Sequence, residues 1–379
     1  MSRRILLLIT DLQIGGSPTV VRELAIRLNA IDGVTCDVAC LSTWGPTADQ
    51  LRDAGVQVSA LDARGAHDLP RTISRFVKLV REQQYDTVMS FLIHANIIAA
   101  MGKPFLPTTR FFQSIQTTQP TPRWHWTAQR IVAEAAEMFV VPSEAVKRVA
   151  MAWADIDAAK IVVVPNAVEL AEYDSARFAA GAQLRAFPDE EKRAELRSSG
   201  ETEESSAPRT VRIGFIGRLD PIKRVPLLIR AMKHLPTDWR LDIFGEGADR
   251  AMIERAIADD GLTDRVTLHG VIPKPQSALA TIDVLALPSL AEGFGLVLIE
   301  AMAAGVPVVA ADSPGIRDVV QHGVNGLLVD VTDSAAFAKA LQHACAEQKG
   351  TLIAGGMETV REHYDWAAVL PMYRRVFEL

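Results

Sequence analysis

The stretch VLALPSLAEGFGLVLIEAMAAGVPVVAA, residues 284–311, decides the fold because it places two strands and a helix in one apolar run. Val284–Leu287 predicts a short buried strand, and Ala291–Gly295 predicts a turn. Leu296–Ala304 predicts a helix, and Val306 opens the next strand. A helix that joins two buried strands is typical of a parallel sheet. Its first turn leaves backbone amides pointing into the glycine turn, where an anion could bind.

The same alternation of strand-like and helical runs continues along nearly the whole chain of 379 residues. It predicts two doubly wound, Rossmann-like α/β domains that face a cleft. We expect an N-terminal domain over 1–170, a charged connector over 171–209, a C-terminal domain over 210–350, and final helices over 351–379 that pack back toward the N-terminal domain. The expected strands are Ile5–Thr10, Thr35–Leu41, Val56–Leu61, Thr87–Phe91, Arg110–Ile115, Met138–Val141 and Ile161–Val164 in the first domain, and Val211–Ile216, Arg240–Phe244, Val266–His269, Val284–Leu287, Val306–Ala310 and Gly326–Val329 in the second.

Composition limits the classes of function. A net charge of −6 argues against a nucleic-acid-binding protein, because such proteins rely on Lys and Arg contacts to phosphates. Three cysteines are too few for a disulfide framework and fit a reducing cytoplasm. The first residues, MSRRILLLIT, form too short an apolar run for a signal peptide or a membrane span, and they predict the first strand instead. We therefore expect a cytoplasmic protein.

Three loops bear on the predicted cleft. The loop TDLQIGGSPTVV places Gly15 and Gly16 after the first strand, with Ser17 expected as the helix N-cap and Pro18 as the first helical residue. Glycines at this point let a ligand approach the backbone, although a plain strand–helix turn explains them equally well.

The second loop, GRLDPIK (217–223), holds Arg218 and Lys223 at the carboxyl end of a strand. A guanidinium fork and a point charge suit a diphosphate, and a solvated basic loop is the plain alternative. The third loop, FGEG (244–247), has a Gly-x-Gly turn. It lacks the third glycine and the following acidic residue of a dinucleotide site, which disfavours NAD.

These stretches resemble the retaining glycosyltransferases of the GT-B class, in particular glycosyltransferase family 4. The resemblance covers most of the chain, and its most specific feature is the Glu-x7-Glu spacing of Glu292 and Glu300, for which a buried helix with two incidental glutamates is the alternative. The matching segments, in the order of that family, are GGSPTVVRELA (15–25), VPSEAVKRVA (141–150), KIVVVPNAVE (160–169), FIGRLDPIKRVPLLIRAM (215–232), DIFGEG (242–247), VTLHGVI (266–272) and the run from LPSLAEGFG to HGVNGLLV (287–329).

The resemblance implies a hexosyltransferase of cell-envelope or polysaccharide biosynthesis. Such an enzyme moves a sugar from a nucleotide-diphosphate sugar, here expected to be a UDP- or GDP-sugar, to a hydroxyl of a glycan, lipid-linked or small-molecule acceptor. It retains the anomeric configuration and needs no metal and no cofactor besides the donor. Asp155 and Asp157 have the spacing of the metal-binding Asp-x-Asp of other glycosyltransferases but lack supporting ligands, so we expect them at the surface.

The resemblance also implies a role for each residue of the donor site. Arg218 and Lys223 would neutralise the leaving diphosphate, and Glu292 would hydrogen-bond the hydroxyls of the sugar. Glu300 would hold the ribose, and the backbone at Val271 would contact the base. The other donor-binding positions are loop residues whose backbone would approach the donor: Gly15, Gly16, Gly217, Gly245, Gly293, Phe294, Gly295 and Leu296.

One departure from the family concerns the acceptor side. Many members carry a histidine after the strand that matches TRFFQSIQTTQP (109–120), where this chain has Gln113, Gln116 and Gln119. His94, which follows the preceding strand, is the candidate that would assist the acceptor in catalysis, and a structural role for it is equally open.

Other functions and a membrane partner also remain open. A nucleotide-sugar epimerase shares the two-domain architecture, and a non-catalytic binding subunit would keep the fold without turnover. The helix expected over Arg71–Gln83 has an apolar stripe for the core and a basic stripe, and Trp124 and Trp126 lie beside Arg123 and Arg130. These features suit an anionic membrane surface or, equally, a solvated face with buried tryptophans. The basic stripe consists of Arg71, Arg75, Lys78 and Arg81, and the apolar stripe of Ile73, Phe76, Val77 and Val80.

Overall fold

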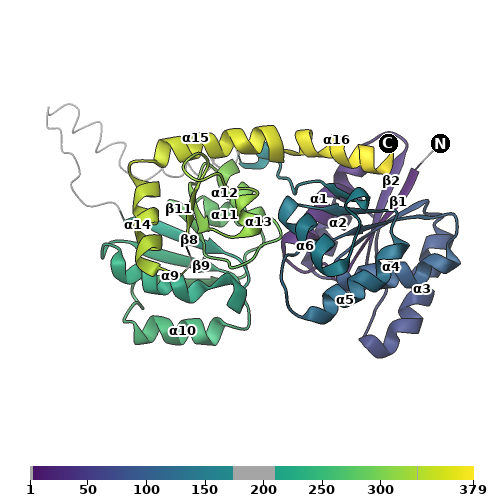
Figure 1. Cartoon of the computed structure of the whole chain (residues 1–379), viewed down its shortest axis with the longest axis horizontal. Helices are drawn as coiled ribbons and strands as arrows, with labels where there is room; N and C mark the ends of the chain where they lie inside the picture. Colours follow the sequence, from purple (N-terminus) through teal and green to yellow (C-terminus); the bar gives the residue numbers. More distant parts are fainter. Residues whose placement is uncertain (1–2, 174–209, 331) are drawn as a thin grey trace. The chain divides into compact units, whose positions relative to one another are not determined.

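The structure is a computed structural model that describes residues 3–173, 210–330 and 332–379. It divides into two compact units, each built on a parallel sheet with crossover helices (Figure 1), which confirms the two predicted α/β domains. The expected connector falls almost entirely on residues 174–209, which lie outside the described residues. The first unit comprises Met1–Ala167, Glu292–Phe294 and Trp366–Leu379, and the second comprises Val168–Ala291 and Gly295–Asp365.

The first unit contains a seven-stranded sheet in the order β3-β2-β1-β4-β5-β6-β7, and all its strand pairs are parallel. Five consecutive residues of β1, from Ile5 to Ile9, are buried, as expected when helices cover both faces of a sheet. Its strands are β1 (Arg3–Ile9), β2 (Val34–Cys40), β3 (Val58–Ala60), β4 (Thr87–Phe91), β5 (Arg110–Ser114), β6 (Met138–Val141) and β7 (Ile161–Val163).

The helices of the first unit follow the predicted apolar periodicity. On α3 the side chains of Phe76, Val77 and Val80 are buried in the core, as predicted, while the side chain of Ile73 packs against it in a partly buried position. The helices are α1 (Gly16–Asn29), α2 (Pro46–Asp53), α3 (Leu69–Glu82), α4 (Ile93–Gly102), α5 (Arg123–Val132), α6 (Glu144–Ala154) and α16 (Trp366–Phe377).

Helix α1 begins earlier than the sequence predicted. Its first residue is Gly16 and its N-cap is Gly15, so the prediction of Ser17 as N-cap and Pro18 as first helical residue was wrong. The reason is that the Gly15 carbonyl already accepts a helical hydrogen bond from the Thr19 amide, at 3.1 Å.

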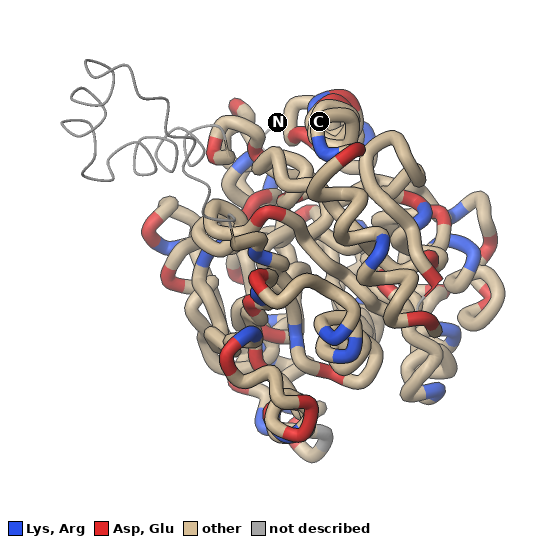
Figure 2. The backbone as a smooth tube through the Cα atoms, turned by 90° about the vertical axis from the view of Figure 1, so that its left-hand side faces the viewer, with Lys and Arg blue, Asp and Glu red and all other residues tan. Residues whose placement is uncertain are grey.

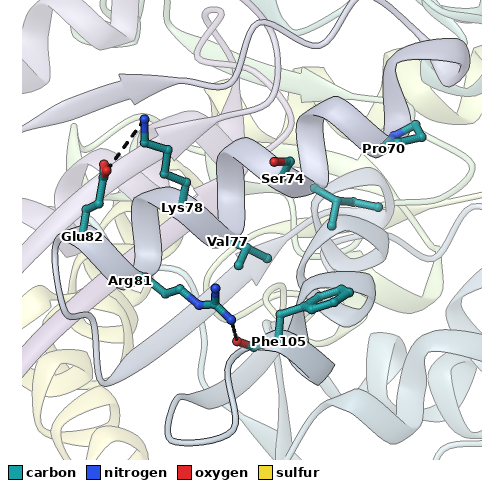
Figure 3. A pocket seen from close by; sticks show the side chains of 8 residues that line it. Pro70, Ser74, Val77, Lys78, Arg81, Glu82 and Phe105 are labelled. Carbon is teal, nitrogen blue, oxygen red and sulfur yellow. Dashed lines mark hydrogen bonds and ion pairs between the residues drawn. The ribbon is translucent and has the colours of Figure 1, made fainter.

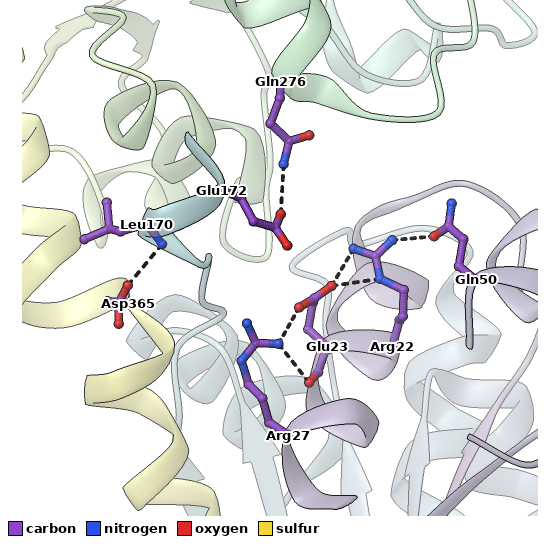
Figure 4. Close-up of polar contacts among 8 residues, drawn as sticks. All are labelled: Arg22, Glu23, Arg27, Gln50, Leu170, Glu172, Gln276 and Asp365. Carbon is purple, nitrogen blue, oxygen red and sulfur yellow. Dashed lines mark hydrogen bonds and ion pairs between the residues drawn. The ribbon is translucent and has the colours of Figure 1, made fainter. Parts of the chain in front are cut away.

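Ion pairs within α1, and contacts of its arginines with α2 and α16, hold this helix in the first unit. Glu23 pairs with Arg22, at 2.6 Å, and with Arg27 one turn further along the helix. Arg22 also donates to Gln50 of α2 (Figure 4). The Arg27 guanidinium lies 4.7 Å from the centre of the Trp366 ring in α16. These contacts hold α1, and with it the glycine pair at its start.

The second unit contains a six-stranded parallel sheet in the order β10-β9-β8-β11-β12-β13. Strand β12 begins at Val308, two residues later than predicted. Pro307 has no amide hydrogen to donate to a neighbouring strand, so the hydrogen-bonded strand begins after it. The strands are β8 (Arg212–Ile216), β9 (Arg240–Phe244), β10 (Val266–Gly270), β11 (Val284–Leu287), β12 (Val308–Ala311) and β13 (Leu327–Val329). The helices are α9 (Val225–Ala231), α10 (Arg250–Asp259), α11 (Pro275–Leu279), α12 (Leu296–Ala303), α13 (Pro314–Arg317), α14 (Ser334–Cys345) and α15 (Lys349–Thr359).

Side-chain contacts also fix the first residues of the second unit (Figure 4). The Leu170 amide donates to the Asp365 carboxylate at 3.1 Å, and Gln276 of α11 donates to Glu172 at 3.3 Å.

Figure 2 shows Lys and Arg interspersed with Asp and Glu along the chain, in keeping with the modest net charge of −6.

Strand order reverses once in each sheet, between β1 and β4 in the first unit and between β8 and β11 in the second. At such a switch point the loops that leave the two strands diverge, and ligands of doubly wound sheets bind in the crevice that opens there. The predicted site residues should therefore be sought at the carboxyl ends of β1, β4, β8 and β11.

Candidate functional site

The loops at the carboxyl ends of the second sheet are joined by backbone hydrogen bonds. The Gly217 amide donates to the Phe244 carbonyl at 3.0 Å, which ties the loop after β8 to the end of β9. The Leu290 amide donates to the Ile222 carbonyl at 2.9 Å, which ties the loop after β11 to the loop after β8. The switch point of this sheet is thus an ordered group of loops.

Arg218 and Lys223 both come from the loop after β8, and Asp220 lies between them. The Arg218 Nη2 is 3.0 Å from the Asp220 Oδ2, and the Lys223 amide donates to the Asp220 carbonyl at 2.9 Å. The Arg218 side chain is 68% exposed, so its guanidinium can still donate to a ligand from the solvent side. Two cations in one ordered loop can neutralise a diphosphate.

The loops after β8 and β9 approach each other closely at Gly245. A β-carbon on Gly245 would lie 1.9 Å from the Gly217 carbonyl oxygen, and its φ of +140° suits glycine alone. The Gly245 amide donates to the Gly270 carbonyl at 2.7 Å, and Val271, which follows, is 51% exposed. The predicted positions Gly217, Gly245 and Val271 therefore lie at the carboxyl ends of three neighbouring strands.

Helix α12 presents the second glutamate of the motif. Gly295 is its N-cap, in the left-handed region at φ +84°, and it provides no side chain for capping the amides that begin at Leu296. Glu300 lies inside this otherwise apolar helix and is only 8% exposed. Burial of a carboxylate is unfavourable unless polar partners surround it, so Glu300 is not an ordinary helix residue.

The first glutamate of the motif belongs to the other unit. Residues Glu292–Phe294 cluster with the first unit, where the Thr118 hydroxyl donates to the Glu292 carbonyl at 2.8 Å. The Ser143 hydroxyl, at the N-cap of α6, donates to the Gly293 carbonyl at 2.6 Å, and Phe294 is buried. By its contacts Glu292 is thus assigned to the first unit, and Glu300 to the second.

The glycine pair of the first unit is not explained by the packing around it. Gly15 has an extended backbone, and among the described residues a β-carbon there would meet Pro18 alone, at 3.7 Å. A β-carbon on Gly16 would have no atom within 4 Å among those described. Neither the backbone conformation nor a described neighbour therefore requires glycine at either position, and a ligand that approaches the backbone and a plain strand–helix turn both remain consistent with the pair.

His94 lies in the first turn of α4, at the switch point between β1 and β4. Leu92, directly before the helix, has φ +71°, which is strained for a leucine and typical of functional sites. The exposed His94 ring contacts the rings of Trp124 and His125 on α5, each with 5.7 Å between ring centres. Burial, and secondarily the charge of His94, lower the pKa of His125 below its ordinary value.

The sequence analysis did not single out His125. Its only signal was its place between two tryptophans, Trp124 and Trp126, after a strand and a proline-rich turn.

Three glutamines occupy the segment 109–120, where the resemblance led us to look for a histidine, and each has a structural contact. Gln113 is buried and accepts from Gln129 at 2.7 Å. Gln116 donates to the Ser114 hydroxyl at 2.7 Å, and the Gln119 backbone amide donates to the Thr117 hydroxyl at 3.0 Å.

Asp155 and Asp157 lie at the surface, as expected. Asp155 pairs with Arg130 at 3.0 Å, and Asp157 caps a short helical turn through the Ala159 amide. Within residues 3–173, 210–330 and 332–379, no three His, Cys, Asp or Glu side chains group as metal ligands. No helix in that part of the chain is long and apolar enough to cross a membrane.

A surface pocket of about 540 Å³ lies along α3 in the first unit (Figure 3), and none of the predicted site residues lines it. Arg81 donates there to the Phe105 carbonyl at 2.8 Å, and Lys78 pairs with Glu82 at 3.7 Å. The pocket is lined by Pro70, Ile73, Ser74, Val77, Lys78, Arg81, Glu82 and Phe105.

Two family models match the chain and together cover most of it. The model "Glycosyltransferase Family 4" matches residues 14–172, and the model "Glycosyl transferases group 1" matches residues 210–347. The first contains Gly15, Gly16 and His94, and the second contains Arg218, Lys223 and both glutamates of the motif.

Curated relatives carry names from inositol glycosylation. The D-inositol 3-phosphate glycosyltransferase of Xylanimonas cellulosilytica is 37% identical over 170 residues, which are 42% of this chain and 41% of the relative. The protein of the same name from Pseudarthrobacter chlorophenolicus is 28% identical over 363 residues, 86% of this chain and 81% of the relative. The phosphatidyl-myo-inositol mannosyltransferase of Mycobacterium leprae is 36% identical over 190 residues, which are 46% of this chain and 50% of the relative. The match thus spans half or less of the first and third relatives.

Solved structures share the fold over the full length. The Anabaena protein HepE, crystallised with UDP and glucose, superposes with a TM-score of 0.83 at 19% identity and covers all of both chains. Sucrose-phosphate synthase from Thermosynechococcus elongatus superposes with a TM-score of 0.76 at 22% identity, over 99% of this chain and 100% of the other. These likenesses establish the two-domain GT-B fold.

Proposed function

The chain belongs to the glycosyltransferases, with a family 4 domain followed by a group 1 domain, and we propose that it moves a hexosyl group from a UDP- or GDP-sugar to an acceptor hydroxyl with retention of configuration. The observation that carries the donor class is the ordered loop with Arg218 and Lys223 at the carboxyl end of β8. A diphosphate is the ligand that best matches two cations at a switch point.

In this proposal the two cations act on the leaving group. Arg218 and Lys223 stabilise the negative charge that develops on the diphosphate as the bond to the sugar breaks, and they are already in place when the donor binds. Because this charge is met by side chains, no divalent metal is required. The acceptor hydroxyl attacks from the face that the diphosphate leaves, which retains the configuration without a protein nucleophile.

Each of the remaining donor contacts is assigned to one part of the donor: the sugar, the ribose, the base or the phosphates. Glu292 hydrogen-bonds the sugar hydroxyls, and Glu300 holds the ribose from α12. The backbone at Val271 contacts the base, and the amides from Phe294 to Leu296 approach the phosphates. The open space around Gly16 admits the donor to the backbone of the first unit.

For the acceptor we propose a molecule that contains an inositol ring, either as a soluble inositol phosphate or linked to lipid. The support is the similarity of this chain to D-inositol 3-phosphate glycosyltransferases and to a phosphatidyl-myo-inositol mannosyltransferase. The exposed histidine at the first switch point, His94, provides a polar group for an acceptor hydroxyl.

We also propose that the first unit binds reversibly to an anionic membrane surface through α3. The side chains of Lys78 and Arg81 line the pocket in Figure 3 together with Phe105, which is 55% exposed. Basic side chains next to an exposed aromatic ring suit an anionic interface. The sequence analysis gave Trp126 two alternatives, a membrane contact or a buried position. In the structure Trp126 is buried and its indole donates to the Gln119 carbonyl at 2.8 Å, so it does not form part of the proposed membrane surface.

Sedimentation with vesicles tests this membrane proposal. Binding to anionic vesicles at low salt, weakened by high salt and absent from neutral vesicles, is the expected result. Failure to sediment with either kind of vesicle would contradict it.

Thermal denaturation with a panel of UDP-, GDP- and ADP-sugars tests the donor class. A donor present at ~100 times its dissociation constant adds ~2.7 kcal/mol to the free energy of unfolding, which raises the melting temperature measurably. The stabilising donor is then incubated with D-inositol 3-phosphate, and the products are analysed by mass spectrometry and by NMR of the anomeric proton.

The products distinguish the possible activities. A glycosylated inositol phosphate with the anomeric configuration of the donor supports the proposal, and an inverted product contradicts retention. A new sugar nucleotide formed without acceptor would show an epimerase. Donor binding without turnover on any inositol or glycan acceptor would show a binding subunit.

A further inference from the structure

Three aromatic side chains of the first unit, two exposed and one partly buried, form a cluster that no donor role accounts for. His94 comes from the first turn of α4, and Trp124 and His125 come from the first turn of α5. The centres of the His94 and Trp124 rings are 5.7 Å apart, and those of Trp124 and His125 are 4.2 Å apart, with edge-to-face geometry. Trp124 is 50% exposed. We call these three residues the ring cluster.

The ring cluster lies at the carboxyl edge of the first sheet. Helix α4 follows β4, and α5 follows β5, which is the next strand in the sheet. The loop with Gly15 and Gly16 follows β1, on the other side of β4. The ring cluster therefore borders the switch point of this unit, where a ligand of a doubly wound sheet binds.

A buried chain of amides holds the two helices of the cluster together. Asn96 of α4 donates to Gln129 of α5 at 2.9 Å, and Gln129 donates to Gln113 of β5 at 2.7 Å. The Ser90 hydroxyl of β4 donates to Asn96 at 2.7 Å. Buried polar networks whose members are hydrogen-bonded fix one arrangement of the elements that they join. This buried network therefore fixes the separation of α4 and α5, the two helices that carry the three rings.

An exposed indole beside two imidazoles has a definite binding chemistry. The indole offers an apolar face, and each imidazole offers a nitrogen that can donate or accept a hydrogen bond. Burial and, secondarily, the charge of His94 lower the pKa of His125, which favours its neutral form, and a neutral imidazole retains an acceptor nitrogen. A hydroxylated ring has the complementary pattern, with C–H groups on its faces and hydroxyls around its edge.

We propose that the ring cluster is the platform that binds the acceptor ring, a six-membered polyol such as a cyclitol or a pyranose. Trp124 packs against one face of that ring, and His94 and His125 hydrogen-bond its hydroxyls. This inference rests on the proposed function and adds the residues that select the acceptor. It also assigns a ligand to Trp124 and His125, which the sequence had not placed in the site.

The test compares Trp124→Ala with Trp153→Ala as a matched control. Trp153 is also an exposed tryptophan of the first unit, at 42%, and packs edge-to-face on Trp126 instead of joining the ring cluster. With D-inositol 3-phosphate as acceptor, Trp124→Ala should raise the acceptor KM about tenfold and leave the donor KM unchanged, and Trp124→Phe should recover part of the loss. Trp153→Ala should change neither KM. Equal acceptor KM values in Trp124→Ala and the parent enzyme would overturn the proposal.

A second measurement separates failure of this inference from failure of the proposed function. Saturation-transfer NMR detects binding of D-inositol 3-phosphate, methyl α-mannoside or methyl α-glucoside without any turnover. The expected result is transfer of saturation to the ring protons of at least one probe, lost in Trp124→Ala and kept in Trp153→Ala. A parent protein that binds none of the three probes, whether or not it binds nucleotide-sugars, would contradict the ring cluster as a platform.

Discussion

Replacing Arg218 by alanine should separate catalysis from stability more clearly than any other single change. In the structure its guanidinium contacts Asp220 at 3.0 Å, with 68% of the Arg218 side chain and 25% of the Asp220 side chain exposed. Ion pairs at this degree of exposure contribute ~0–1 kcal/mol to the free energy of unfolding. The folded state should therefore lose less than ~1 kcal/mol when the pair is removed.

The expected loss in the transition state is larger. Removing one preorganised group that stabilises developing charge typically lowers kcat by ~10²–10³-fold, which corresponds to ~2.7–4 kcal/mol. The same loss is expected for Lys223→Ala, because both cations act on one diphosphate. Since the diphosphate gains charge as the bond breaks, the effect should be on kcat more than on donor binding.

The assay measures initial rates of sugar transfer and thermal unfolding on the same preparations. Arg230→Ala is the matched control, because Arg230 is an exposed cation of α9 outside the loop that holds Arg218. The control should keep its transfer rate within about twofold. The reasoning is refuted if Arg218→Ala and Lys223→Ala both keep full activity. It is also refuted if their loss of activity follows a comparable loss of stability.

Three further predictions concern the glutamates, metal dependence and the histidine pair. Glu292→Gln should lower kcat while nucleotide binding survives, whereas Glu300→Gln should raise the donor KM with little change in kcat, because a ribose contact is similar in ground and transition states. Both are measured by steady-state kinetics. EDTA should leave the transfer rate unchanged, and a rate abolished by EDTA and restored by Mg²⁺ would contradict charge neutralisation by side chains. His94→Gln should raise the pKa of His125, measured by NMR titration, because it removes the repulsion between the rings. The pKa should stay below its ordinary value, because burial, the larger cause, remains.

The fold and the loops of the second unit could be predicted from the sequence because both depend on local patterns. Strand β9 and strand β11 begin and end where the apolar runs predicted them. Arg218 lies two residues after the end of β8, so the prediction of that strand already placed it at the carboxyl edge of the sheet. The prediction of the start of α1 failed because two local rules competed there. Ser17 is a favourable N-cap residue, but the Gly15 carbonyl already accepts a helical hydrogen bond, so the helix begins at Gly16.

The ion pair of Arg218 with Asp220 could also have been inferred, since only one residue separates them. The approach of Gly245 to the Gly217 carbonyl could not, because it joins loops from two strands whose register is fixed by the whole sheet. The same holds for Glu292, since its placement with the first unit depends on Thr118 and other residues far from it in the sequence.

The ring cluster shows most clearly why the acceptor side is harder to predict than the donor side. A donor loop needs a cation after a strand, which is a property of one segment. The contact of His94 with Trp124 needs two helices at a fixed separation, and the bond between Asn96 and Gln129 that sets it spans 33 positions of the chain. An amide pair has no periodicity or spacing that marks it in a sequence. Residues that select an acceptor can therefore vary without leaving a recognisable motif, provided that a buried network elsewhere keeps their helices together.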